Sequence, residues 1–144
     1  MKHYNDLNEK EKEQLLKFPV YISLLASSTG TGIDEDEKDT AMKITHVKSF
    51  ASDPLLIDFY KEAEHVFKKT LAVLDNELPH NREERKNAIQ NELNKLESLL
   101  RTLDPQFVAS LGRSMRSYKY YISKSHQNVL EYFIFPMPID GITD

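Results

Sequence analysis

The chain contains no cysteine, and this absence excludes disulfide bonds, thiolate chemistry and metal sites built on cysteine ligands. Four glycines and six prolines are too few for an all-β chain that turns tightly many times. No apolar stretch approaches the roughly 20 residues that cross a bilayer. The first residues lead into a charged run without the apolar core of a signal peptide. We therefore expect a cytoplasmic protein that does not enter a membrane.

The remaining composition is typical of one soluble globular domain. Among the 144 residues, 40% are hydrophobic and 29% are charged, and a chain of this length can bury a sizeable core. The formal net charge of −4 argues against a general binder of nucleic-acid backbones. We expect residues 1–144 to form a single all-α domain.

Helix start and stop signals predict a bundle of about six helices. Asn8 and Glu11 have the spacing of a capping box and open a short charged helix within residues 1–16. Pro19 begins a helix that is apolar nearly all round and should lie at the centre of the bundle. Replacing Leu25 in that helix with alanine should then cost about 2–5 kcal/mol. The later helices are expected over residues 34–51, 54–78, 81–103, 105–122 and 122–135, before an extended tail over residues 136–144.

Apolar residues on the two longest predicted helices indicate how these helices pack. One stripe runs at helical spacing from Leu56 to Leu78. The next helix carries a narrower seam, with alternating spacings of four and three residues, formed by Ile89, Leu93, Leu96, Leu100 and Leu103. This seam can pack against the preceding stripe as an antiparallel hairpin, or against a second copy of the chain as a homodimer.

A glycine-containing turn leads into a cluster of acidic residues with the spacing of half a calcium loop. Asp34, Asp36 and Glu37 are the candidate ligands for a divalent metal ion in this cluster. The earlier ligand positions of such a loop fall on alanine, serine and glycine, which carry no carboxylate. Asp34 and Glu37 are more simply interpreted as a capping box at the start of the next helix.

The same stretch resembles the TerB-like family of all-helical proteins, which is associated with tellurite resistance and stress response. The residues that match the turn of that family are Gly30, Ile33, Asp34 and Glu37. One residue is inserted at Gly32, and the resemblance covers residues 15–75. It implies a helical fold and a divalent-metal site in which the turn aspartate of the family takes part. That aspartate falls on Thr29 here, so one of the implied ligands is replaced by a neutral hydroxyl.

Histidines and basic residues form further patterns. Glu62 and His65 have the spacing of a di-iron carboxylate site, but no second motif of this kind occurs on another predicted helix, and His65 should face water. His46 has no acidic partner at local spacing. The helix after Pro105 carries a basic face formed by Arg113, Arg116, Tyr120 and Lys124. This face can bind phosphate or nucleic acid, or it can pair with the acidic N-terminal helices or with a partner surface.

No set of serine, histidine and carboxylate has catalytic spacing, so the sequence predicts no catalytic residue and no cofactor. The favoured hypothesis is a non-enzymatic helical interaction module that binds a protein partner or a second copy of itself. The TerB-like resemblance adds a role in stress response or tellurite resistance. A divalent-metal-binding domain is the alternative, and an enzyme whose site converges from distant residues is a further one. Nucleic acid is not an expected partner.

Overall fold

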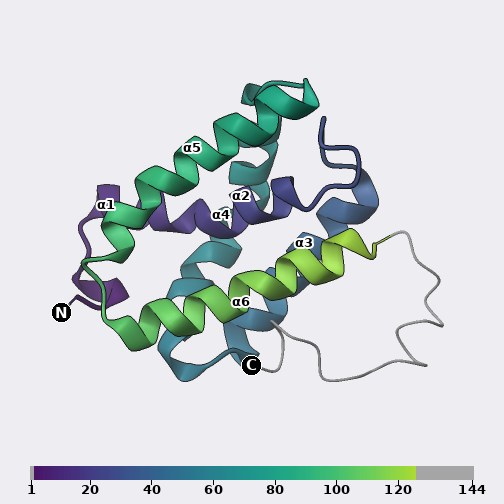
Figure 1. Cartoon of the computed structure of the whole chain (residues 1–144). Helices are drawn as coiled ribbons and strands as arrows, with labels where there is room; N and C mark the ends of the chain where they lie inside the picture. The colour runs from purple at the N-terminus through teal and green to yellow at the C-terminus, as the bar shows by residue number, and fades with distance from the viewer. Residues whose placement is uncertain (1, 126–144) are drawn as a thin grey trace.

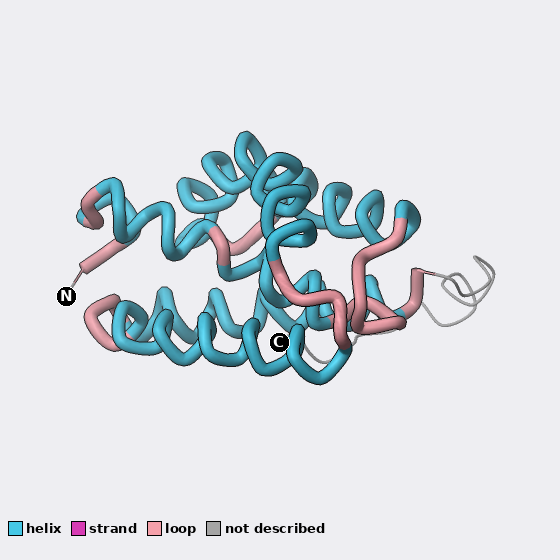
Figure 2. Tube along the Cα trace, turned by 90° about the horizontal axis from the view of Figure 1, so that it is seen from above, coloured by secondary structure: helices cyan, strands magenta, loops and turns pink. Residues whose placement is uncertain are grey.

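Six α-helices and two short 3-10 helices follow one another in the computed structural model, which describes residues 2–125 (Figure 1). The 3-10 helices are η1 (Tyr4–Asp6) and η2 (Pro54–Leu56). The α-helices are α1 (Glu9–Leu16), α2 (Phe18–Leu25), α3 (Glu35–Ala51), α4 (Ile57–Glu77), α5 (Arg82–Leu100) and α6 (Pro105–Ser123). Within these residues no strand forms, and one isolated bridge joins Lys2 to Leu103 (Figure 2). The predicted all-α single domain is therefore confirmed.

The chain after Ser125 lies outside the described residues. Helix α6 ends at Ser123 and is followed by a turn at Lys124 and Ser125. The remainder of the helix expected over residues 122–135, and the extended tail expected over residues 136–144, stay predictions.

Side-chain caps explain where several helices begin. Asn8 accepts a hydrogen bond from the Glu11 N–H while the Glu11 carboxylate accepts from the Asn8 N–H, at 2.8 and 3.0 Å. This reciprocal pair confirms the predicted capping box. Asn81 also accepts from the Glu84 N–H, but without the return bond. Each cap satisfies a backbone donor that the first turn of a helix leaves unpaired, so local sequence fixes these starts.

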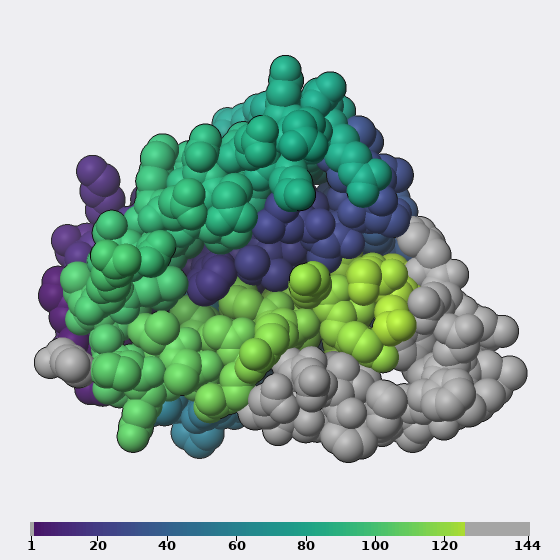
Figure 3. Space-filling view, viewed as in Figure 1, coloured from purple at the N-terminus to yellow at the C-terminus, as the bar shows by residue number. Residues whose placement is uncertain are grey.

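Helix α2 occupies the centre of the bundle and packs against α1, α4, α5 and α6. Its Val20 and Leu24 are buried, at 0% and 1% exposure, as predicted for a central helix. Leu25, however, remains 36% exposed. Figure 3 shows α2, in purple to blue, reaching the surface between α5 and α6. The expectation that α2 is buried all round was wrong, because the neighbouring helices leave one side open, and Leu24→Ala is the change that should cost about 2–5 kcal/mol.

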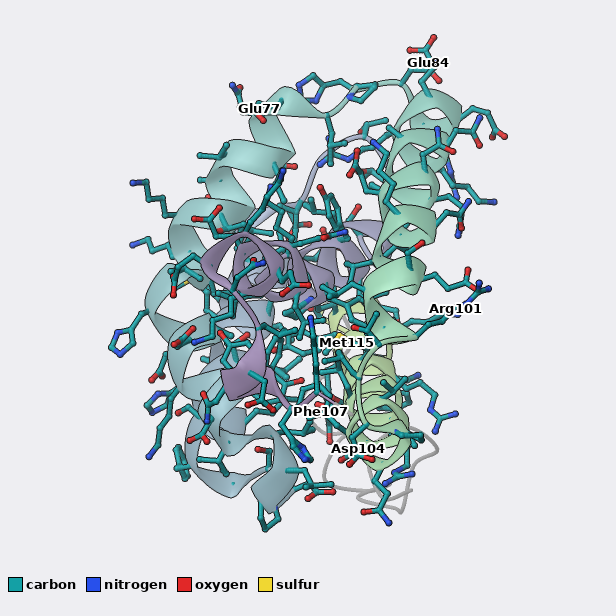
Figure 4. The ribbon with its side chains drawn as sticks, turned by 90° about the vertical axis from the view of Figure 1, so that its left-hand side faces the viewer. Glu77, Glu84, Arg101, Asp104, Phe107 and Met115 are labelled. Carbon is teal, nitrogen blue, oxygen red and sulfur yellow. The ribbon has the colours of Figure 1, made fainter. Side chains whose placement is uncertain are left out.

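The packing of α5 also differs from the predicted hairpin. Helix α5 contacts α2 and α1, while α2 in turn contacts α4. Figure 4 shows α4 and α5 on opposite sides of the view, with the N-terminal helices between them. The hairpin prediction was wrong because the large apolar surface of α2 fills the space between the two stripes. Ile89 and Leu96 of the predicted seam are thus buried within one chain, and self-association stays a prediction.

The core joins the stripe of α4 to the inward face of α6. Phe107 and Met115 of α6 point into the bundle, whereas Glu84 and Arg101 point outward (Figure 4). The rings of Phe67 and Tyr118 stack across the α4 and α6 contact, with centroids 6.2 Å apart. Among the described residues, no helix combines the length and apolar character needed to cross a membrane.

Candidate functional site

The acidic turn before α3 brings Asp34 and Glu37 together as a structural cap. The Glu37 N–H donates to Asp34 Oδ1 at 2.9 Å, and Glu37 Oε1 accepts from the Asp34 N–H at 3.1 Å. Glu37 Oε2 also accepts from the Ser28 N–H at 2.8 Å, and the residue is only 1% exposed. Both carboxylate oxygens of Glu37 therefore hold backbone groups of the turn. The predicted capping box is confirmed.

The candidate metal ligands do not gather around one point in the structure. Asp34 and Asp36 are exposed at the start of α3, whereas Glu37 is buried beneath the turn. Over residues 2–125, no group of three or more histidine, aspartate or glutamate side chains has an arrangement that suits a metal ion. Thr29 bonds within the turn, because its hydroxyl donates to the Gly32 carbonyl at 3.2 Å. The turn is thus held by its own hydrogen bonds.

A buried ion pair anchors the turn to the rest of the bundle. The guanidinium of Arg85, which is 1% exposed, pairs with the Asp75 carboxylate and donates to the Pro79 carbonyl at 3.2 Å. Asp75 Oδ1 also accepts from the Ile33 N–H at 3.2 Å. Asp75 therefore ties together α4, α5 and the chain leading into α3. The Nε atom of the same arginine and the Oγ atom of Ser27 are buried without a hydrogen-bond partner.

The histidines among residues 2–125 lie at separate exposed places. His65 is exposed, as predicted from its position opposite the apolar stripe. His46 pairs with the Glu64 carboxylate, a contact between α3 and α4 that local spacing did not reveal. Hydrogen bonding to His46 lowers the pKa of Glu64. His80 lies near the Thr31 carbonyl, at 3.1 Å from its Nδ1. These contacts connect loops and helices, and they do not converge on a common centre.

A groove of about 580 Å³ lies between α3 and α6. Its charged lining residues are Lys43, Lys48, Asp53 and Arg113. Its apolar lining residues are Ile44, Val47, Ala51 and Leu56. Its hydroxyl-bearing lining residues are Thr40, Ser52, Ser110, Ser114, Ser117 and Tyr121. We call this surface the α3–α6 groove, and its volume lies within the range of ordinary ligand pockets.

Lys48 is one of three cationic residues that line the α3–α6 groove. Its ammonium lies over the rings of Tyr60 and Tyr118, at 5.7 and 5.8 Å from their centroids. Among the described residues, no carboxylate forms an ion pair with Lys48, and burial lowers the pKa of its ammonium to about 8. The two aromatic faces compensate part of the cost of desolvating the charge. Lys48 therefore offers a partly buried positive charge to an anionic group that enters the groove.

A network of buried hydroxyl groups holds the two tyrosine rings that contact Lys48. The hydroxyls of Tyr118 and Thr45 lie 2.7 Å apart, and Tyr60 pairs with Ser114. Thr45 also donates to the carbonyl of Ala41 at 2.8 Å. Burial raises the pKa of both tyrosines above the usual range, so their hydroxyls stay neutral. The rings beneath Lys48 are therefore fixed by tertiary hydrogen bonds, and they hold their faces toward the ammonium.

Asp53 also lines the α3–α6 groove. Asp53 accepts from the Leu55 N–H at 3.0 Å and from the Ser110 hydroxyl at 2.6 Å. These hydrogen bonds, with Ser110 the largest contributor, and the nearby charge of Arg113 lower the pKa of Asp53. The one carboxylate of the groove lining thus joins η2 to α6, and it does not neutralise Lys48.

The predicted basic face of α6 is divided between two surroundings. Arg113 lines the α3–α6 groove, while Arg116 is exposed. Lys124 packs over the ring of Tyr120, with its ammonium 5.0 Å from the centroid. The face is therefore not one continuous basic stripe, and its only contribution to the groove is Arg113.

Sequence reasoning missed Lys48 and the ion pair of Arg85. The sequence did contain one feature that indicates the groove, namely small residues on the faces where α3 and α6 meet. Serines recur on the inward face of α6 at spacings of four and three residues, at Ser110, Ser114 and Ser117. Small side chains at inward positions fill less space than leucine or phenylalanine, so a hollow remains between the helices.

A scan against protein-family models, a search of curated proteins and a search of solved structures each found no match to the chain. These comparisons leave the TerB-like resemblance untested, so it stays a prediction.

Proposed function

We propose that the protein is a non-enzymatic interaction module that binds an acidic, apolar segment of a partner protein in the α3–α6 groove. The observation that carries this proposal is Lys48, a partly buried cation that no described carboxylate pairs with. An aspartate or glutamate of the partner would pair with Lys48, and neighbouring apolar side chains would cover Ile44 and Val47.

The chemistry of the lining favours binding over a reaction. Catalysis by a lysine amine needs a partner that transfers protons within hydrogen-bond reach. Among the described lining residues, the one carboxylate is Asp53, and it accepts hydrogen bonds from Leu55 and Ser110. The hydroxyls of Tyr60 and Tyr118 have raised pKa values, which makes them weak acids. What remains is a mixed apolar and cationic surface, the kind that recognises a peptide side chain by shape and charge.

The proposal is tested by selecting ligands from a random library of short peptides displayed on phage. The selection is run on the full chain and, in parallel, on a Phe133→Ser/Phe135→Ser variant, because apolar residues near the C-terminus can compete for an apolar groove. We expect enrichment of sequences that combine aspartate or glutamate with aromatic or aliphatic residues. A selected peptide should bind about tenfold more weakly to Lys48→Met, which keeps the length of the side chain and removes its charge.

Lys69→Met is the matched control, because Lys69 is an exposed lysine on α4 outside the groove. It should bind the selected peptide as the parent chain does. The proposal would be overturned if neither target enriched acidic apolar sequences, or if Lys48→Met and Lys69→Met bound the selected peptides equally well.

A further inference from the structure

We propose that residues 129–144 of the chain are themselves an acidic, apolar segment that docks in the α3–α6 groove and competes there with partner segments. This inference rests on the proposed function, because it assigns an internal regulator to the same groove. The inference is based on three observations: the residues that line the groove, the position of the last described residue, and the sequence that follows it.

The described chain ends at the edge of the groove. The Ser125 hydroxyl donates to Thr40 Oγ1 at 3.0 Å, and Thr40 lines the groove. From Thr40 to Ala51 the lining on α3 extends over about 17 Å, at 1.5 Å per helical residue. An extended chain covers that length with about five residues, at 3.3 Å each. Residues 126–144 are therefore long enough to reach every part of the groove.

The sequence of this segment matches the apolar part of the lining. Residues 129–135 read Val-Leu-Glu-Tyr-Phe-Ile-Phe, so that six of the seven side chains are apolar or aromatic. Leaving such side chains in water is unfavourable by about 25 cal/mol for each Å² of apolar surface. The groove offers the exposed Val47 and the partly exposed Ile44 as apolar contacts for these side chains.

The charges are complementary as well. Residues 129–144 contain Glu131, Asp140 and Asp144 and no lysine or arginine. The charged residues of the groove lining are Lys43, Lys48, Arg113 and Asp53, which leaves the groove positive. Pairing one of the acidic residues with Lys48 would supply the carboxylate that the described residues do not provide.

Tethering makes even a weak contact effective. A segment attached at the edge of its own binding site acts at an effective concentration on the order of millimolar. A partner segment must therefore bind more tightly than the chain's own segment to displace it. The consequence is a threshold, because the groove is open only to partners whose affinity exceeds this competition.

Cysteine cross-linking tests the docking in the full chain, which has no cysteine of its own. Val47→Cys in the groove is combined with Phe133→Cys, and disulfide formation under mild oxidation is followed by mass spectrometry. Val73→Cys with Phe133→Cys is the matched control, because Val73 lies on α4 outside the groove and is 44% exposed, against 49% for Val47. We expect a monomeric disulfide to form at least about tenfold faster in the Val47 pair, since docking raises the local thiol concentration.

A charge reversal distinguishes docking from random encounter. In the Val47 pair, Lys43→Glu should slow the disulfide several-fold by repelling the acidic segment, while Lys69→Glu on α4 should leave the rate unchanged. Equal rates for the Val47 and Val73 pairs would overturn the inference. A disulfide-linked dimer as the main product would also overturn it, by placing the segment of a second copy in the groove.

The selected peptide separates this inference from the proposed function. If the chain's own segment competes, the peptide should bind about tenfold more tightly to Phe133→Ser/Phe135→Ser than to the parent chain. Equal affinity would overturn the competition while the proposed function stands. Failure to select any acidic apolar peptide on either target, together with rapid cross-linking of the Val47 pair, would overturn the proposed function and keep the docking.

Discussion

Helix α3 carries an acidic region at its N-terminus and a cationic region farther along, and the two differ in what their charges do. At its N-terminus, the carboxylates of the acidic turn accept backbone hydrogen bonds, and the Ile33 N–H of the turn donates to Asp75 of α4, which pairs with the buried Arg85. Farther along the same helix, Lys48 lies in the α3–α6 groove with two aromatic rings and no described carboxylate beside it. A charge that is already paired stabilises the fold, whereas a charge left without its counterion can recruit a ligand.

The comparison shows that a dense cluster of charged residues can serve to cap a helix. Helix N-termini attract acidic residues because the first backbone N–H groups need acceptors and the helix dipole favours negative charge. Asp34 serves this need, because its carboxylate accepts from the Glu37 N–H, while Glu37 accepts from the Asp34 N–H. Lys48, by contrast, stands alone in its stretch of sequence, and only the tertiary packing of α3 against α6 makes its position unusual.

Removing Asp75 is the strongest test of the claim that the charges near the acidic turn stabilise the fold. Asp75→Ala leaves the guanidinium of Arg85, which is 1% exposed, without its counterion, and leaves the Ile33 N–H without an acceptor. The expected loss is about 3 kcal/mol in the free energy of unfolding, measured by urea denaturation. Asn76→Ala, at an exposed neighbouring position, should change it by less than about 0.5 kcal/mol. Similar losses for both variants would show that the ion pair does not anchor the turn.

A second change acts on the backbone of the turn itself. Gly30 has a φ of +70°, and a Cβ there would lie 2.9 Å from Cγ of Arg82. Gly30→Ala should therefore destabilise the protein by about 1–2 kcal/mol. Gly112→Ala provides the opposite control, because Gly112 lies within α6 with nothing within 4 Å of its added Cβ. Gly112→Ala should stabilise the protein by about 0.5–1 kcal/mol. If the free energy of unfolding shifted in the same direction in both variants, the left-handed conformation assigned to Gly30 would be contradicted.

A third change tests whether the acidic turn is only a cap. Asp34→Ala removes the acceptor of the Glu37 N–H and should cost about 1 kcal/mol, measured by thermal or urea unfolding. The loss should be the same in chelator and in excess calcium, magnesium or zinc. A loss that appears only when metal is present would show that the turn binds an ion.

The fold was largely predictable from sequence because its signals are local. Asn8, Asp34 and Pro105 mark helix starts that the structure confirms within a residue or two. The stripe from Leu56 to Leu78 faces the core as its spacing predicts. The order of packing was less accessible, because the insertion of α2 between α4 and α5 depends on the shapes of four helices at once.

The candidate site could not be predicted in the same way. Lys48 is separated from Arg113 by 65 positions in the sequence, and the local basic pattern that contains Arg113 does not include Lys48. The exposure of Leu25 was missed for a similar reason, since the pattern of one helix does not reveal which neighbour is absent. The acidic turn attracted the metal hypothesis because its residues are adjacent, although adjacency at a helix start serves the cap.

The smallest expected effect concerns the pH dependence of stability. Because the pKa of Lys48 falls from its usual 10.5 to about 8 in the folded chain, the unfolded chain binds more protons between these values. Lys48 therefore makes the free energy of unfolding rise with pH in this window. Above about pH 10 the raised pKa values of Tyr60 and Tyr118 act in the opposite direction, because the folded chain then retains more protons.

Urea midpoints measured between about pH 7 and 11 check this dependence. Lys48→Met should remove the rise and leave the fall at higher pH, whereas Lys69→Met should retain both. A rise that survives in Lys48→Met would show that another group causes it.

The most direct test of the central claim compares the two regions of α3 with one ligand. The claim is that the α3–α6 groove, and not the acidic turn, is the binding surface. The affinity of a peptide selected on the parent chain is measured by isothermal titration calorimetry for Lys48→Met and for Asp34→Ala. We predict a loss of about tenfold for Lys48→Met and no change for Asp34→Ala. A loss for Asp34→Ala with unchanged affinity for Lys48→Met would contradict the account.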